Sequence, residues 1–199
     1  MSLKLLLQQT STLNYEENSF TNKKHEESVR TIIEDSGFEE EKSVKKPSNG
    51  SYVYQPHGSQ MPPDFILNFQ GKLYNIECKS SKKTKKPMWN CSIPDENTIY
   101  IFSIPGSNIL FFGDWICDDK TKKIMNEFIQ DSKNLAQKYS KKLLNLDCEY
   151  KWKVTFRKMF EQSTLFDRLK QVKLKKKMDD FIDSLEDDEH IEIVFDDDS

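Results

Sequence analysis

Several features that would assign this chain to a class directly are missing from its sequence. The four cysteines, at positions 78, 91, 117 and 148, form no CxxC pair, and no histidine lies at a zinc-ligand spacing, which argues against a structural zinc site. No apolar run approaches the length of a membrane span, the Leu-rich start at residues 3–7 is too short for a secretory signal, and no internal repeat is present. We therefore expect a soluble, cytoplasmic protein with reduced thiols and no membrane partner. The Leu-rich start is interpreted as the first packed element of the fold.

Basic side chains are missing from one end of the chain. Residues 183–199 carry nine Asp or Glu and no Lys or Arg. Although the whole chain has a formal net charge of −3, the other 24 acidic residues face all 30 basic ones. A basic body with an acidic tail suggests a polyanion partner, but a solubilising tail on an ordinary domain would give the same asymmetry.

The chain has enough large apolar side chains for one core. It contains 199 residues, 36% of them hydrophobic, with 13 Phe, 7 Tyr and 3 Trp, so disorder throughout is not expected. We predict a single domain over residues 1–185 and an acidic tail over 186–199, with a short terminal strand near residues 190–195. The tail is interpreted as a solubility element, with competition for the basic cleft as the alternative.

Hydrophobic periodicity predicts alternating helices and strands. A helical pattern with Val29, Ile32 and Ile33 on one face ends at Gly37, and longer helices are predicted over 121–144 and 165–185. The predicted strands cover 51–55, 64–69, 73–79, 98–104, 109–112 and 150–156, and the turn at 70–72 makes the second and third of them a hairpin. This order predicts an α/β fold with a mixed central β-sheet flanked by helices.

Three side chains of the predicted hairpin form a candidate catalytic cluster. Asp64 begins one strand, while Glu77 and Lys79 lie two residues apart near the end of the other and so share a face. A hairpin brings the start of one strand beside the end of its partner. Two carboxylates held together favour a cation between them, and oxygen ligands suit Mg²⁺. Such a site fits phosphodiester hydrolysis, with Lys79 adding positive charge beside the attacking water.

The residues Pro63–Asp64 and Glu77–Cys78–Lys79, preceded by a helix that carries Glu26, resemble the PD-(D/E)XK nuclease superfamily, and most closely its type II restriction endonucleases. The resemblance implies a restriction-endonuclease-like core in which Asp64, Glu77 and the Cys78 backbone carbonyl bind Mg²⁺ and Lys79 assists the nucleophile. It also makes Glu26 an auxiliary acidic residue, and it implies that Gln60 or Ser80 contacts metal-bound water or phosphate.

Each part of this motif has a simpler interpretation. Glu77 and Lys79 would also make an ion pair on an exposed strand, which contributes little energy. Apolar residues on both faces of the strand argue against that interpretation, because a buried charge without a partner is costly. Glu26 near a helix start is favoured by the helix dipole alone.

Basic and aromatic residues near the hairpin are candidates for DNA contact. Lys82, Lys83, Lys85 and Lys86 would bind phosphates, and Trp89 and Asn90 would contact bases, although a core position is slightly favoured for Trp89. In a second basic stretch, over residues 151–177, Arg157 and Lys158 are the first candidates for contact with bases or phosphates. His57 precedes the motif as an ordinary loop residue.

The combined prediction is a site-specific endonuclease that uses Mg²⁺ to cut double-stranded DNA and acts as a homodimer. Three alternatives remain open: a structure-specific repair or recombination nuclease, an RNA-directed nuclease, and a non-catalytic DNA-binding protein.

Overall fold

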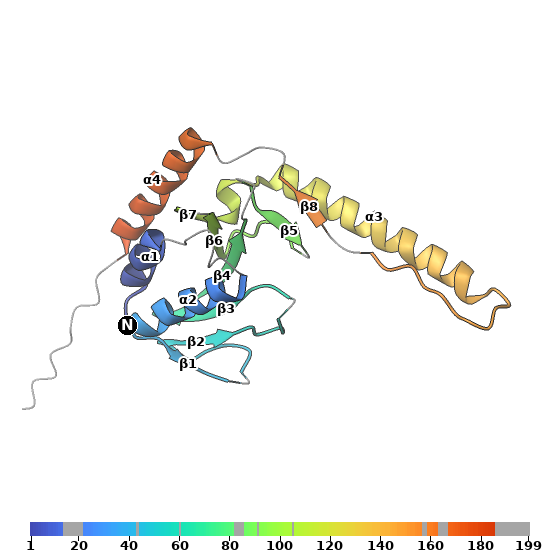
Figure 1. Cartoon of the computed structure of the whole chain (residues 1–199), viewed down its shortest axis with the longest axis horizontal. Coiled ribbons are helices and arrows are strands. Elements are labelled where there is room, and N and C mark those ends of the chain that lie inside the picture. The colour runs from blue at the N-terminus through green and yellow to red at the C-terminus, as the bar shows by residue number, and fades with distance from the viewer. Residues whose placement is uncertain are drawn as a thin grey trace, which may run out of the picture.

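A six-stranded mixed β-sheet organises the body of the protein in this computed structural model (Figure 1). The structure describes residues 1–13, 22–42, 44–59, 61–81, 86–90, 92–104, 106–156, 159–162 and 167–185. The strands in spatial order are β1 (Glu39–Glu40), β2 (Ser51–Tyr54), β3 (Phe65–Phe69), β4 (Lys72–Ser80), β6 (Thr98–Ile104) and β7 (Ser107–Phe112). The β1–β2 and β4–β6 pairs are parallel, and the others are antiparallel.

Helices cover one face of this sheet and enclose the main core. They are α1 (Leu3–Thr12), α2 (Asn22–Asp35) and α4 (Arg168–Ser184), and their apolar side chains pack with those of β2, β3, β4, β6 and β7. A smaller core on the other face includes Trp89, Tyr100 and Phe111 and lies beside a two-stranded sheet of β5 (Met88–Asn90) and β8 (Met159–Glu161). The predicted α/β class, the mixed sheet and its flanking helices are confirmed. The Leu-rich start is a packed element, as predicted.

The predicted hairpin is present as β3 and β4. Phe69 pairs with Lys72 around a two-residue turn in which Gln70 and Gly71 have φ values of 52° and 78°. Two positive φ values define a type I′ turn, whose twist matches that of antiparallel strands. This turn sets the register of every residue along the pair.

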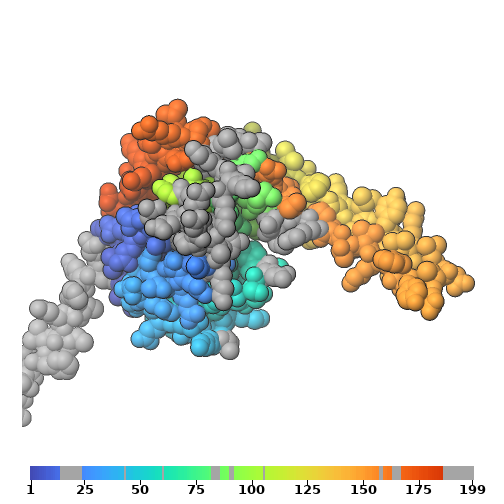
Figure 2. Space-filling view, viewed as in Figure 1, coloured from blue at the N-terminus to red at the C-terminus, as the bar shows by residue number. Residues whose placement is uncertain are grey.

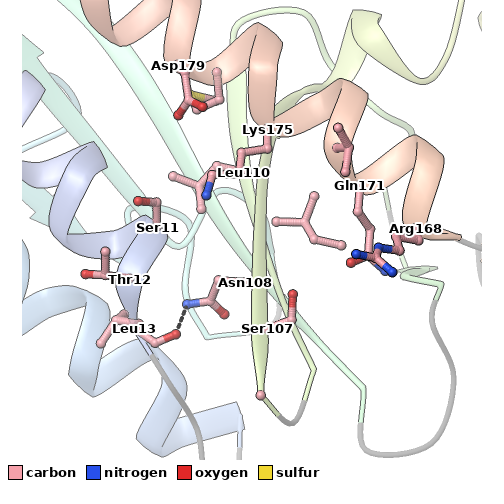
Figure 3. A pocket seen from close by; sticks show the side chains of 14 residues that line it. Ser11, Thr12, Leu13, Ser107, Asn108, Leu110, Arg168, Gln171, Lys175 and Asp179 are labelled. Carbon is pink, nitrogen blue, oxygen red and sulfur yellow. Dashed lines mark hydrogen bonds between the residues drawn. The ribbon is translucent and has the colours of Figure 1, made fainter.

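A buried polar network joins the C-terminal end of α1 and the N-terminal part of α2 to the sheet. His25 Nε2 lies 2.8 Å from Ser103 Oγ, and Ser103 in turn bonds Asn108. Asn108 Nδ2 donates to the backbone carbonyls of Thr10 and Leu13 at 3.1 and 2.9 Å. Figure 3 shows the Asn108–Leu13 bond on the wall of a cavity of about 410 Å³ between α1, β7 and α4. These hydrogen bonds therefore fix the positions of α2, β6, β7 and the end of α1 relative to one another.

One expectation for the second half of the chain needs correction. Residues 150–156 form no strand. The segment runs back along α3 (Asp119–Leu144), where Val154 bonds Ser140 Oγ, and none of the strands in the described residues pairs with it. The strand in this region is β8, which pairs with β5. Ile124, Phe128, Leu135 and Tyr139 form an apolar stripe along α3, and this stripe is largely exposed, with Ile124 at 67% and Leu135 at 57%.

The predicted terminal strand near residues 190–195 and the acidic tail over 186–199 lie outside the described residues. No helix within the described part of the chain is long and apolar enough to cross a membrane.

The buried histidine predicts a pH dependence of folding stability. Burial lowers the pKa of His25 from 6.5 to about 4, so the unfolded chain binds its proton more readily between those values. The free energy of unfolding should therefore fall as pH falls through this window, by up to roughly 3 kcal/mol from this residue. We expect His25→Gln to remove this part of the pH dependence in urea unfolding at pH 7.5 and 5.0. An unchanged difference between the two pH values in the variant would contradict the assignment.

Candidate active site on strands β3 and β4

The register of the sheet brings Asp64 opposite Glu77. β3 pairs Phe65 with Ile76, and one step further along this antiparallel pair Asp64 faces Glu77. The Cys78 backbone N–H donates to Asp64 Oδ2 at 2.7 Å, which confirms that the start of β3 touches the end of β4. The hairpin therefore joins the two carboxylates that the sequence separates by thirteen positions.

Lys79 completes this group on the sheet face opposite α2. Its Nζ donates to Glu77 Oε1 at 2.7 Å, and the two side chains are only 11% and 10% exposed. Lys79 Nζ also lies 5.7 Å from the centre of the Trp89 ring, within range of a cation–π interaction. The pair is thus mostly buried, which rules out the interpretation as an exposed surface ion pair.

Asp64 carries the clearest electrostatic sign of crowding. Its burial, and then the neighbouring charge of Glu77, raise the pKa of Asp64 to about 7. Glu26 adds a smaller rise, while the Cys78 N–H and Lys79 oppose it. A carboxyl group whose pKa is displaced this far by burial and a like charge is typical of functional sites.

Glu26 approaches the same group from α2. Its Oε2 accepts hydrogen bonds from the Tyr54 hydroxyl at 3.0 Å and from Gln55 Nε2 at 3.3 Å. Burial and this bond raise the pKa of Tyr54 to about 12, so its hydroxyl stays a donor. The Gln55 backbone N–H also donates to the Asp64 carbonyl at 2.7 Å. The residue that binds Glu26 through its side chain is therefore held beside Asp64 by its backbone.

The donor set fits a hard divalent cation. Glu77 Oε2 is buried and has no hydrogen-bond partner, although Lys79 binds the other oxygen of the same carboxylate. Among the described residues no group of three or more His, Cys, Asp and Glu side chains is placed to hold a metal ion. Mg²⁺ does not require such a group, because it keeps several waters and often binds through one or two carboxylates.

The Cys78 backbone faces this site while its side chain does not. The thiol packs against the main core on the helical face, and burial followed by the charge of Asp64 raises its pKa well above the usual value. In an extended strand the N–H and C=O of one residue point to the same neighbouring strand. The Cys78 carbonyl therefore lies on the Asp64 side, where its predicted ligand role requires it.

The predicted DNA-contacting residues are less clearly placed. Ser80 is half-buried at the end of β4, and Lys86 forms an ion pair with Glu161 of β8. Trp89 is 2% exposed and packs edge-on against Tyr100, which favours the core interpretation over base contact. Asn90 lies in β5, opposite Met159. The remaining candidates fall outside the described residues: Gln60, Lys82, Lys83, Lys85, Arg157 and Lys158.

Two residues of the site escaped the sequence analysis. Tyr54 and Gln55 hold Glu26 beside Asp64, yet they stand at the end of a four-residue strand within no recognisable motif. The only indirect signal was that β2 precedes the motif and can pair with β3. Comparison of the chain with protein-family models, curated proteins and solved structures finds no match.

Replacing one carboxylate should stabilise the metal-free protein. The pKa of Asp64 is about 7 in the folded protein, compared with an ordinary value of 3.8. At pH 8 the carboxyl is ionised in both states, and because its charge is less favourable in the folded state, it lowers the free energy of unfolding. We expect Asp64→Asn, which keeps an acceptor for the Cys78 N–H, to raise the free energy of unfolding by about 1–3 kcal/mol in EDTA. The gain should shrink as pH falls toward 4. Lower stability of the variant at pH 8 would show that favourable contacts outweigh the crowding.

Proposed function

We propose that this protein is a Mg²⁺-dependent endonuclease that hydrolyses phosphodiester bonds in double-stranded DNA. The observation that carries the proposal is the pairing of Asp64 with Glu77 at the junction of β3 and β4, with Lys79 bound to one Glu77 oxygen and the other oxygen without a partner. The likeness of these residues to the PD-(D/E)XK motif supports the same reaction.

Each side chain has a role that its position supports. Asp64 and Glu77 hold the cation, which when bound supplies Lewis-acid polarisation of the phosphoryl oxygen and a bound water of lowered pKa. Lys79 places a positive charge beside that carboxylate pair, where it stabilises the negative charge that develops on the phosphate. Glu26 adds negative charge at the edge of the site, and its carboxylate is held in place by hydrogen bonds from Tyr54 and Gln55.

The finer parts of the proposal rest on the resemblance to type II restriction endonucleases. We propose that cleavage occurs at specific sequences and that two copies of the chain assemble so that each cuts one strand. The basic character of residues 1–182 supports a polyanionic substrate.

The direct test is cleavage of plasmid and phage DNA with Mg²⁺ or with EDTA. We expect discrete products with Mg²⁺ only, and Lys79→Met should slow cleavage at least about 100-fold. Lys42→Met is a matched control, because Lys42 also pairs with a Glu two residues before it, but on the surface, where the Lys side chain is 81% exposed. Circular dichroism and thermal unfolding confirm that both variants fold.

The pattern of products separates the alternatives. A defined ladder supports sequence-specific cleavage, whereas nicks at junctions or flaps indicate a structure-specific nuclease. Preferential cleavage of RNA would replace the proposed substrate. If the folded wild-type protein cleaves no nucleic acid with Mg²⁺ or Mn²⁺, the nuclease proposal is wrong.

A second variant pair tests the part played by α2. Glu26→Gln keeps acceptors for Tyr54 and Gln55 but removes the charge, so we expect the rate of Mg²⁺-dependent cleavage to fall about 10- to 100-fold. The neighbouring Glu27 is exposed, and Glu27→Gln should cleave at the wild-type rate. Equal cleavage rates for both variants and the wild type would show that Glu26 has no part in cleavage and acts only in the stability of α2.

A further inference from the structure

An arm projects from the body of the protein (Figures 1 and 2). It consists of α3 and the segment 147–156 that runs back along it. The helix has 26 residues, which gives a length of about 39 Å. Ser140 Oγ accepts from the Val154 N–H at 2.8 Å, and the Phe128 ring packs against Phe156 and Phe160. These contacts hold the returning segment against the helix.

A groove of about 640 Å³ follows the distal half of this arm. Lys133, Gln137 and Lys141 lie on it at helical positions i, i+4 and i+8, so they form one row, and the two lysines are about 12 Å apart along the axis. Met61 lines the same groove and precedes Asp64 by three residues. The other lining residues are uncharged, and none of the described residues along the groove is Asp or Glu: Ala136, Ser140, Leu144, Val154, Thr155 and Phe156.

The charge of the arm complements a polyanion. Residues 119–156 contain nine Lys and five Asp or Glu, and the groove carries only positive charge among its described lining residues. Lysines in a row along one helix face contact successive phosphates without reading bases. We propose that this groove binds the phosphate backbone of duplex DNA and leads it to the candidate active site. This inference rests on the proposed function.

A second copy of the chain is the other occupant to consider. An exposed apolar stripe of α3, formed by Ile124, Leu135 and Tyr139, lies at 100° per residue on roughly the opposite side of the helix from Lys133 and Gln137, whereas Leu144 and Val154 line the groove itself. An interface between two copies would use that stripe and leave the groove open. Pairing of two grooves would bring like charges together, so the groove itself favours DNA.

The test compares two charge-reversed variants of the same helix. The groove variant combines Lys133→Glu with Lys141→Glu. The control variant combines Lys120→Glu with Lys138→Glu, which changes the net charge of the protein by the same amount at positions outside the groove. Affinity for a 30-base-pair duplex is measured by fluorescence anisotropy in EDTA over a range of salt concentrations. We expect the groove variant to bind at least about tenfold more weakly and to reduce the salt slope by about two, with a change below about threefold in the control.

Each result has a defined meaning. Equal losses in both variants would show only a general charge effect and would overturn the groove assignment, as would unchanged affinity in the groove variant. Loss of a dimer by the groove variant in sedimentation velocity, with equal DNA affinity per protomer, would assign the groove to self-association and also overturn it. Because binding is measured without metal, groove-dependent binding by a protein that never cleaves DNA would refute the nuclease but keep the groove. Normal cleavage and normal binding by the groove variant would refute the groove but keep the nuclease.

Discussion

The close approach of Asp64 and Glu77 is the constraint on which the rest of the site depends. Two carboxylates in a mostly buried position repel each other, and the Cys78 N–H and Lys79 offset only part of that repulsion, as the raised pKa of Asp64 indicates. The sheet must therefore hold them together. It does so because the type I′ turn at Gln70–Gly71 sets the β3–β4 register, and β4 is also fixed on its other side by six paired residues of β6. A slip of one residue would turn Glu77 and Lys79 into the apolar core beneath α2.

Helix α2 must be held just as firmly, because Glu26 approaches the site from it. At one end of the helix His25 bonds Ser103 of β6, and further along Arg30 bonds Glu40 and the Tyr52 hydroxyl. These polar contacts fix the rotation of the helix, which apolar packing of Val29 and Ile33 alone would leave less specific. The orientation of Glu26 is thus determined by residues that do not touch the carboxylate pair.

The sequence predicted the parts of the site that are local. Asp64, Glu77 and Lys79 lie on two strands joined by a short turn, so hydrophobic alternation and the Gly71 signal were enough to place them together, and the buried strand at 98–104 was visible as an apolar run. Residues 150–156 alternate as a strand does, but no strand within the described residues pairs with them, and alternation alone does not supply a partner. The three-residue strands β5 and β8, like the burial of Trp89, arise from contacts between distant segments that local patterns do not encode.

The arm and the site share one connection through the loop that precedes Asp64. Met61 lies on the groove of the arm, and three residues later the same loop enters β3 at the carboxylate pair. A helix that needed only internal stability would bury its apolar stripe, yet α3 exposes Ile124 and Leu135 and carries lysines along its groove. Exposure of apolar surface on one side and of a single sign of charge on another is typical of an element that meets partners on both. The fold thus places the sheet, where the carboxylates require rigid support, apart from the arm, which carries the groove proposed to bind DNA.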